Sequence, residues 1–452
     1  MNNELKTFTF YQVYVRNYTK EGTFKALIKK LDYIKDLGIK VIQLLPINEI
    51  GINGRKGTLG SPYSISDYYK INHEYGTIDD FKELVFEIHK RNMLVIMDVV
   101  FNHTSRDSVL IKEHPEFYYI NKNGDFANRF GNWTDVYDLN YTNNQLLIDY
   151  VTEVLKYYVN LGVDGFRFDV ASLLSNELYR YAFPKLREIN KNIILLGEAI
   201  EPEFASFVRE NDCNCCSDSE LYEDGFDLLY RYSNYELLRD YLKTKDVKFL
   251  DYYKRSFLYE NVCLPTKALK IGTLENHDIQ RICSFTKSDQ LRMNLNAFIF
   301  FIKGAGFVYG GQETKECKLP SLFDKDDISL EILDINYFNF IKRLIALKSN
   351  KLNLELIQSN CLDLGKYVIG FKNIYKNNEP IIGLFNMSEN VIKLNDKILE
   401  NGDYIDLISN KTVIIRNNSL ELSYPLYLKK KKWIYFSNQI SYKFHLKSSW
   451  FL

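Results

Sequence analysis

The spacing of apolar and polar positions alternates between two periods along the first 350 residues. Short continuous apolar runs, such as residues 40–45, are typical of strands buried in a parallel sheet, and stretches with helical spacing separate them. Strands are predicted around Tyr11, Val41, Leu94, Phe166, Ile194, Phe226, Leu269 and Phe307. Helices are predicted at residues 23–37, 78–91, 144–161, 176–189, 248–259 and 288–302, with further helix up to about residue 348.

Eight alternating strand and helix units favour a (β/α)8 TIM barrel over an open doubly wound sheet. We assign residues 1–103 and 143–350 to this barrel, with the sixth strand, near Phe226, having the weakest pattern. Residues 104–142 show no strong period and are predicted to form a short excursion domain over the barrel mouth, because long loops at that end of a barrel are usually functional.

The pattern changes after residue 350 to short β-type runs at residues 367–372, 381–386, 390–394, 404–407 and 431–436. Turn residues divide these runs, as in antiparallel sheets. We therefore predict a C-terminal β-sandwich domain over residues 351–452.

The segment 162–171 reads Gly-Val-Asp-Gly-Phe-Arg-Phe-Asp-Val-Ala. Phe166, Phe168 and Val170 alternate with Arg167 and Asp169, so a strand here would present both charged groups on one face. Taken alone, this pattern indicates an Arg-Asp ion pair on a solvated strand face. The other strand ends change that interpretation.

Polar side chains follow four of the predicted strands. They are Asp98, Asn102 and His103 after the third strand, Arg167 and Asp169 on the fourth, Glu198 after the fifth, and His277 and Asp278 after the seventh. The functional groups of a TIM barrel lie at these C-terminal strand ends. Because like charges brought together cost free energy, four converging carboxylates indicate a catalytic centre better than a set of helix caps.

Four segments of the chain resemble the signature segments of the α-amylase family of glycoside hydrolases, in the same order and spacing. They are Asp98-Val-Val-Phe-Asn-His103, Gly165-Phe-Arg-Phe-Asp169, Gly197-Glu198-Ala and Glu275-Asn-His-Asp278, supported by Ser61-Pro-Tyr63, Tyr75-Gly-Thr77 and Asp138-Leu-Asn140. The resemblance runs from about Phe10 to Lys348, and the β domain that follows fits the third domain usual in the family.

The resemblance implies a role for each strand-end residue. Asp169 would be the nucleophile, Glu198 the acid/base, and Asp278 the group that grips and distorts the sugar. The remaining implied roles belong to His103 and His277, which would bind the same sugar, Tyr63, which would stack on it, and Asp98, which would support Arg167. The chemistry of a retaining glycosidase needs the same division, because one carboxyl must be ionised and the other protonated. We expect Arg167 to keep Asp169 ionised.

The resemblance also makes a calcium ion a candidate cofactor. Asn102 and Asp138 match two calcium positions of the family, and hard oxygen ligands of this kind suit Ca2+. Ser172 and Leu173 depart from the Lys-His found in many endo-acting members, although the Leu173 carbonyl could still serve as a ligand. Val170 is a residue type often seen in members that cut α-1,6 bonds.

The function that these features favour is a retaining α-glycosidase acting on maltodextrin- or starch-type α-glucans. An α-1,6-acting glucosidase or a 4-α-glucanotransferase would use the same residues, so linkage, endo or exo action and the acceptor stay open. A non-catalytic carbohydrate- or protein-binding barrel is disfavoured because Asp169, Glu198 and Asp278 are all present. A phosphate-binding barrel would need a Gly-rich loop after its last strands, and none follows there.

Composition and charge exclude other classes. Lys+Arg and Asp+Glu both number 58, so no polyanionic partner such as nucleic acid is indicated. No window has the apolar length of a membrane span, and the N-terminal residues do not have the pattern of a signal peptide. Seven Cys, an odd number, fit a reducing compartment, so we expect a cytoplasmic protein, of open oligomeric state. The cluster Cys213, Cys215 and Cys216 has no second metal-binding knuckle and is interpreted as free thiols.

Overall fold

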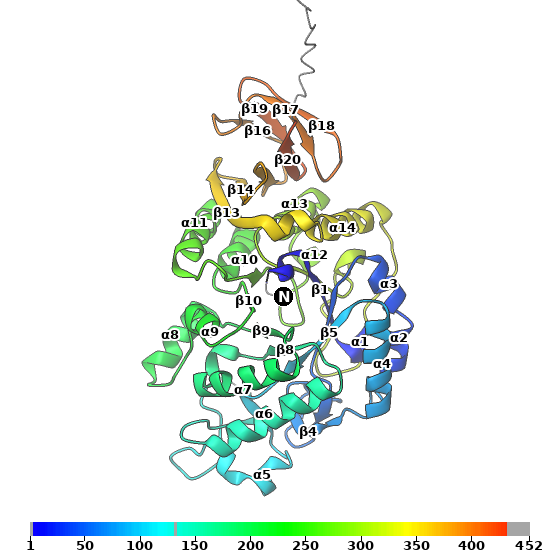
Figure 1. The fold of residues 1–452 in the computed structure, drawn as a ribbon, viewed down its shortest axis with the longest axis vertical. Coiled ribbons are helices and arrows are strands. Elements are labelled where there is room, and N and C mark those ends of the chain that lie inside the picture. The colour runs from blue at the N-terminus through cyan, green and yellow to red at the C-terminus, as the bar shows by residue number, and fades with distance from the viewer. Residues whose placement is uncertain (1–2, 131–132, 432–452) are drawn as a thin grey trace, which may run out of the picture.

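The computed structural model describes residues 3–130 and 133–431 (Figure 1). A barrel occupies the middle of the molecule, with the C-terminal strands at one end and the excursion after the third barrel strand at the other (Figure 1). Nearly all of the run predicted at 431–436 lies outside the described residues.

The barrel consists of eight parallel strands in the order β11-β10-β9-β8-β5-β2-β1-β12. Their bounds are β1 Thr9–Val13, β2 Val41–Leu44, β5 Leu94–Val99, β8 Gly165–Phe168, β9 Ile194–Gly197, β10 Leu228–Tyr230, β11 Lys270–Ile271 and β12 Gly306–Tyr309. The edge strands β11 and β12 meet where Ile271 bridges to Ala305, whose N–H donates to the carbonyl of Lys270 over 3.2 Å. The predicted (β/α)8 barrel is confirmed, including its weak sixth strand.

Helices surround this sheet. The helices before β8 are α1 Val15–Tyr18, α2 Phe24–Ile28, α3 Leu31–Asp36, α4 Ile78–Lys90, α5 Leu110–Glu113 and α6 Gln145–Asn160. Those after it are α7 Asn176–Ile189, α8 Pro202–Glu210, α9 Asp218–Glu223, α10 Tyr235–Thr244, α11 Val247–Cys263, α12 Ile282–Phe285, α13 Asp289–Phe301 and α14 Ile335–Lys348. The single helix predicted at 23–37 is divided into α2 and α3. The helices that were not predicted are α1, α5, α8, α9, α10 and α12.

The register of the barrel explains why charged groups meet in its interior. Asp98 on β5 lies beside Arg167 on β8 in the ladder, while Phe168 points outward and packs against Tyr179 and Phe183 of α7. The Arg167 side chain is 1% exposed. The interpretation of this strand face as solvated is therefore wrong, because its charged side faces the closed interior of the barrel.

Four smaller sheets lie outside the barrel sheet in the described residues. In the excursion, β6 (His103–Ser105) pairs antiparallel with β7 (Val136–Asp138), and nearer the barrel β3 (Asn48–Ile50) pairs with β4 (Ile65–Ile71). The C-terminal part forms a six-stranded sheet in the order β13-β14-β15-β20-β17-β18 and a separate β16–β19 pair. Bounds there are β13 Leu356–Asp363, β14 Val368–Tyr375, β15 Ile381–Asn386, β16 Ile392–Asn395, β17 Gly402–Asp406, β18 Thr412–Ile415, β19 Ser419–Leu422 and β20 Leu426–Lys430. The antiparallel C-terminal part is confirmed, while the residue limits of the domains stay a prediction.

Short 3-10 turns complete the chain. They are η1 Glu4–Thr7, η2 Pro115–Phe117, η3 Ala171–Leu173, η4 Gln312–Thr314 and η5 Lys351–Glu355. Of these, η3 directly follows the fourth barrel strand and begins beside the predicted nucleophile. In the part of the chain that the structure describes, no helix has the length and apolar character to cross a membrane.

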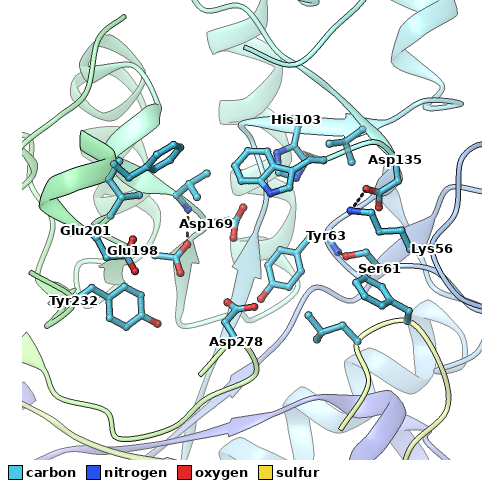
Figure 2. A pocket seen from close by; sticks show the side chains of 18 residues that line it. Lys56, Ser61, Tyr63, His103, Asp135, Asp169, Glu198, Glu201, Tyr232 and Asp278 are labelled. Atoms are coloured by element: carbon cyan, nitrogen blue, oxygen red, sulfur yellow. Dashed lines mark hydrogen bonds and ion pairs between the residues drawn. The ribbon is translucent and has the colours of Figure 1, made fainter. Parts of the chain in front are cut away.

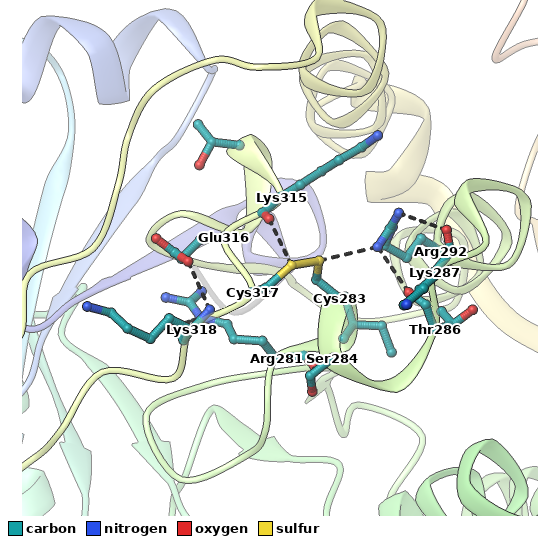
Figure 3. The surroundings of a disulfide bond; sticks show 12 residues. Arg281, Cys283, Ser284, Thr286, Lys287, Arg292, Lys315, Glu316, Cys317 and Lys318 are labelled. Carbon is teal, nitrogen blue, oxygen red and sulfur yellow. Dashed lines mark hydrogen bonds between the residues drawn. A yellow bond between two sulfur atoms is a disulfide. The ribbon is translucent and has the colours of Figure 1, made fainter.

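Two of the seven cysteines are paired. Cys283, in α12, forms a disulfide with Cys317 in the loop after β12, with 4.9 Å between their Cα atoms (Figure 3). Sequence reasoning did not predict this pair, because it depends on two loops that follow the neighbouring strands β11 and β12. The other five cysteines are free thiols, including the cluster Cys213, Cys215 and Cys216.

Candidate active site

The guanidinium of Arg167 joins three carboxyl groups inside the barrel mouth. Its Nη1 lies 2.8 Å from Asp98 Oδ1 and 2.8 Å from Asp169 Oδ1, and its Nη2 lies 2.5 Å from Glu198 Oε1. All four side chains are at least about nine-tenths buried, with Glu198 the most exposed at 11%. One positive charge thus faces three largely buried acids, so the three cannot all ionise freely.

The backbone at Val170 orients Glu198. Val170 has φ 38° and ψ 46°, a left-handed conformation that is unfavourable for a β-branched residue. In this conformation its N–H donates to Glu198 Oε2 over 2.8 Å (Figure 2). The strained turn therefore holds the acid of the fifth strand next to the carboxyl of the fourth.

Burial sets the protonation of this cluster. It raises the pKa of Asp169 to about 6 against the opposing charge of Arg167, and it likewise raises the pKa of Asp98 to about 6. Burial raises the pKa of Glu198 further, to about 7, with Asp169 and Asp278 adding to the effect and Arg167 opposing it. Near neutral pH the proton is thus held best by Glu198. Arg167 favours the ionised Asp169 as expected, but burial outweighs it.

His277 and Asp278 occupy the seventh-strand side of the same mouth. The His277 ring stacks on Tyr63 at 5.3 Å between centroids, and its Nε2 lies 2.9 Å from Asp278 Oδ2. Burial acts to raise the pKa of Asp278, but the charge and hydrogen bond of His277 lower it below the ordinary value. The Asp278 side chain is 53% exposed, so an ionised carboxylate projects into the open part of the pocket.

Tyr63 links the acids around Arg167 to His277 on the seventh-strand side of the mouth. Its hydroxyl donates to Asp98 Oδ2 over 2.9 Å and lies 2.5 Å from His277 Nε2. The aromatic ring thus remains on the pocket wall while its polar end is occupied. This leaves a ring face for an apolar sugar surface, as predicted for Tyr63, although the contact itself stays a prediction.

These side chains line a cavity of about 420 Å³, within the range of small-molecule pockets (Figure 2). The predicted residues on its wall are Tyr63, His103, Asp169, Glu198 and Asp278, while Asp98 and Arg167 lie buried behind them. His103 is itself buried, and its ring lies 5.3 Å from that of Trp133. The structure therefore brings together all eight residues that sequence reasoning assigned to catalysis and substrate binding.

Other residues of the pocket wall were missed. They include Lys56, Trp133, Asp135, Glu201, Phe204 and Tyr232. Trp133 and Asp135 belong to the excursion, whose mixture of aromatic and acidic residues was the available signal, but no periodicity indicated which of them face the barrel.

The predicted calcium positions lie in a different cavity, of about 540 Å³, which Asn102, Asp138 and Leu173 line together with Arg129. Both Asp138 oxygens already accept hydrogen bonds, one from Asn128 Nδ2 over 3.1 Å and one from the Arg129 N–H over 2.6 Å.

Arg129 also reaches the neighbouring oxygens with its side chain. Its guanidinium donates to Asn140 Oδ1 over 2.7 Å and to the Leu139 carbonyl over 3.3 Å. Calcium takes six to eight oxygen ligands, and across residues 3–130 and 133–431 no group of three or more His, Cys, Asp or Glu is placed to hold a metal. The residues present do not fit calcium, because both Asp138 oxygens already accept from neighbouring N–H groups and the Arg129 guanidinium lies against the adjacent oxygens of Leu139 and Asn140.

A closed (β/α)8 barrel with an acid that retains its proton beside one that ionises more readily has the groups that glycoside hydrolases use. The chain belongs to the α-amylase family, whose model for the catalytic domain of alpha amylase matches residues 9–331.

Comparison with individual proteins gives the same family. The chain is 36% identical over 208 residues to an oligo-1,6-glucosidase of Bacillus cereus, covering 38% of this chain and 36% of that protein. It is 26% identical over 347 residues to alpha-amylase 3 of Dictyoglomus thermophilum, covering 68% of this chain and 64% of that protein. The crystal structure of an alpha-amylase from Lactobacillus plantarum superposes with a TM-score of 0.87 at 32% identity, covering 94% of this chain and 99% of that one. The chain thus spans between about a third and two thirds of these curated relatives.

Proposed function

We propose that the protein is a retaining α-glycoside hydrolase that cleaves α-glucosidic bonds of maltodextrin- or starch-type glucans. The observation that carries this proposal is the single guanidinium of Arg167, which holds Asp169 and Glu198 together at 2.8 and 2.5 Å. Retaining glycosidases use two carboxyls about 5 to 5.5 Å apart, and sharing one guanidinium is compatible with so close an arrangement. The similarity to proteins named alpha-amylase supports the substrate class.

In the first step, a carboxylate oxygen of Asp169 attacks the anomeric carbon while Glu198 gives its proton to the departing glycosidic oxygen. The bond from Asp169 to the sugar forms as the bond to the leaving group breaks, through an oxocarbenium-like transition state. In the second step Glu198, now ionised, takes a proton from water, and that water releases the sugar from Asp169. Asp278 binds hydroxyls of the reacting sugar. The Tyr63 ring stacks on the apolar face of the same sugar.

Labelling with a mechanism-based fluorosugar tests this scheme. The fluorine destabilises the oxocarbenium-like transition state and makes the second step slow, so a covalent glycosyl ester should accumulate on Asp169 and be found by peptide mass spectrometry. An ester on any other residue would contradict the assigned nucleophile.

Activity should depend on pH as a bell-shaped curve. Asp169 must be ionised and has a pKa raised to about 6, so kcat/KM should fall as pH drops below about 6. Glu198 must be protonated and has a pKa raised to about 7, so kcat/KM should fall as pH rises above about 7. A pH profile of kcat/KM on maltoheptaose checks both limbs, and a flat profile between pH 5 and 9 would contradict the assignment.

An α-1,6-acting glucosidase is the second candidate. Val170 beside the nucleophile and the similarity to an oligo-1,6-glucosidase both favour it. A 4-α-glucanotransferase would transfer the same glycosyl group to a sugar. Rates on isomaltose and maltoheptaose separate the α-1,6-acting from the α-1,4-acting hydrolase. Chromatography of the products identifies a transferase, whose main products include chains longer than the substrate.

Arg129, rather than a metal ion, is predicted to hold the base of the excursion. Replacing it with Met should destabilise the fold by about 1.5 to 3 kcal/mol, the usual contribution of hydrogen bonds from a charged group. Thermal unfolding should show the wild type unchanged by EDTA or added calcium, and the R129M variant melting lower. Lys112→Met, which removes an exposed charge of the same excursion, is the matched control. A wild type that melts lower in EDTA and recovers with calcium would contradict the prediction.

A cytoplasmic location remains part of the proposal, and the Cys283–Cys317 pair counts against it, since disulfides are rare in reducing compartments. We propose an α-glucan as partner and no nucleic acid, on the balanced charge of the chain.

A further inference from the structure

One side of the catalytic pocket is bounded by a loop between β3 and β4, residues 51–60, which we call the rim loop. It contains Gly51, Gly54, Gly57 and Gly60. A loop so rich in glycine would be mobile if it were free. Its contacts with two other segments hold it in place.

The first segment is the excursion. Lys56 Nζ lies 2.9 Å from Asp135 Oδ1, and both residues line the catalytic pocket. The Asp135 side chain is 4% exposed and that of Lys56 34%, so the bridge is partly shielded from solvent. Asp107 adds a second link, accepting from the N–H groups of Ile52 at 2.8 Å and Asn53 at 3.1 Å.

The second segment follows the last barrel strand. The Leu59 N–H donates to the carbonyl of Phe323 over 2.9 Å, and Asp324 Oδ1 accepts from both the N–H and the hydroxyl of Thr58, at 2.8 and 2.7 Å. Gly57, at φ 62°, lies so close that a Cβ there would be 2.6 Å from that of Phe323. The rim loop therefore forms a continuous wall with the excursion and the loop after β12.

The chemistry determines which end of a bound sugar this wall faces. A sugar whose anomeric carbon lies at Asp169 directs its leaving oxygen toward Glu198. Its C4 hydroxyl lies on the opposite side of the ring and points away from Glu198. Figure 2 shows Glu198 and Glu201 on one side of Asp169, and Lys56 with Asp135 on the other side, beyond Tyr63. The wall thus faces the C4 end, where the preceding sugar of a longer chain would be attached.

We propose that the Lys56–Asp135 bridge closes the donor end of the pocket, so that the enzyme accepts α-glucans only by their non-reducing end. This inference rests on the proposed function. A terminal sugar has a free C4 hydroxyl, which both donates and accepts hydrogen bonds, and the Lys56–Asp135 pair offers both partners. An internal sugar carries a further unit on that oxygen, which the wall excludes. Lys56 is then a specificity-determining residue, and action is exo rather than endo.

The test compares maltoheptaose with maltoheptaose whose terminal C4 and C6 hydroxyls are capped as an acetal. The wild type should cleave the free substrate and cleave the capped one at least about 100-fold more slowly, since a pocket built around a hydroxyl rejects substrates that lack it. Lys56→Ala opens the wall and should narrow this ratio by about tenfold, chiefly by faster cleavage of the capped substrate. Lys70→Ala, which removes an exposed lysine of β4 that does not line the catalytic pocket, should keep the wild-type ratio.

The outcomes separate the two proposals. Equal cleavage of both substrates by the wild type would overturn the closed donor end and leave the proposed hydrolase intact. Cleavage of neither, nor of isomaltose, would overturn the proposed function and the inference with it. The wild-type ratio of free to capped cleavage is decisive even if Lys56→Ala folds poorly, which thermal unfolding would reveal. A folded Lys56→Ala variant with an unchanged ratio would show that Lys56 does not determine this specificity.

Discussion

Asp169→Asn is expected to lower kcat on α-glucans by at least about 10⁴-fold, because an amide cannot attack the anomeric carbon. The substitution keeps the size of the side chain. The amide oxygen can still accept from Arg167 Nη1, which lies 2.8 Å from Asp169 Oδ1 in the wild type. The loss should therefore be in the chemical step. KM should change much less than kcat, since Tyr63 and Asp278 still contact the substrate.

The measurement is single-substrate kinetics on maltoheptaose, with thermal unfolding to show that the fold is retained. Asp79→Asn makes the same chemical change at a side chain that is 84% exposed, and it should leave kcat unchanged. A D169N variant within tenfold of the wild type would exclude Asp169 as the nucleophile. Because the variant replaces a carboxyl that burial disfavours in its charged form, it should also melt no lower than the wild type at neutral pH.

The parts of the site that the sequence predicts are those that follow from strand order. Residues at the C-terminal ends of parallel strands must meet at one barrel mouth, so Asp98, Arg167, Asp169 and Glu198 could be placed together without coordinates. Their register then makes one guanidinium serve three acids. The resemblance of their segments to a known family added the expected role of each.

The rest of the site depends on loops that no periodicity describes. Lys56 and Asp135 come from two irregular segments distant in sequence, and only the folded contacts among the rim loop, the excursion and the loop after β12 bring them to the pocket. Arg129 was missed for a similar reason: motif matching indicated the oxygens at Asn102 and Asp138 but not the guanidinium lying against the adjacent oxygens of Leu139 and Asn140. The pKa of Asp169 could not be foreseen either, since it depends on how deeply the cluster is buried.

Glu198→Gln should lower kcat on maltoheptaose by about 10² to 10⁴-fold, the usual contribution of a general acid. The effect should be much smaller for the first step with an α-glucosyl fluoride, whose leaving group needs little help from a proton. Glycosyl-enzyme should then accumulate, because the second step still needs a base. The basic limb of the pH profile, which reports the raised pKa of Glu198, should disappear for this substrate. Equal losses on both substrates would contradict the role of Glu198 as the acid.

The same variant tests the link between catalysis and stability. The pKa of Glu198 is raised in the fold to about 7, so the folded protein binds its proton more tightly than the unfolded chain. The stability that this proton contributes is present below the ordinary pKa of a glutamate, near 4.5, and is lost as pH rises through about 7. A neutral Gln has no charge to bury, so E198Q should gain stability over the wild type at pH 8 and gain less at pH 5. Thermal unfolding at the two pH values measures this difference. A gain that is larger at pH 5 would mean that Arg167 stabilises the ionised carboxylate more than burial disfavours it.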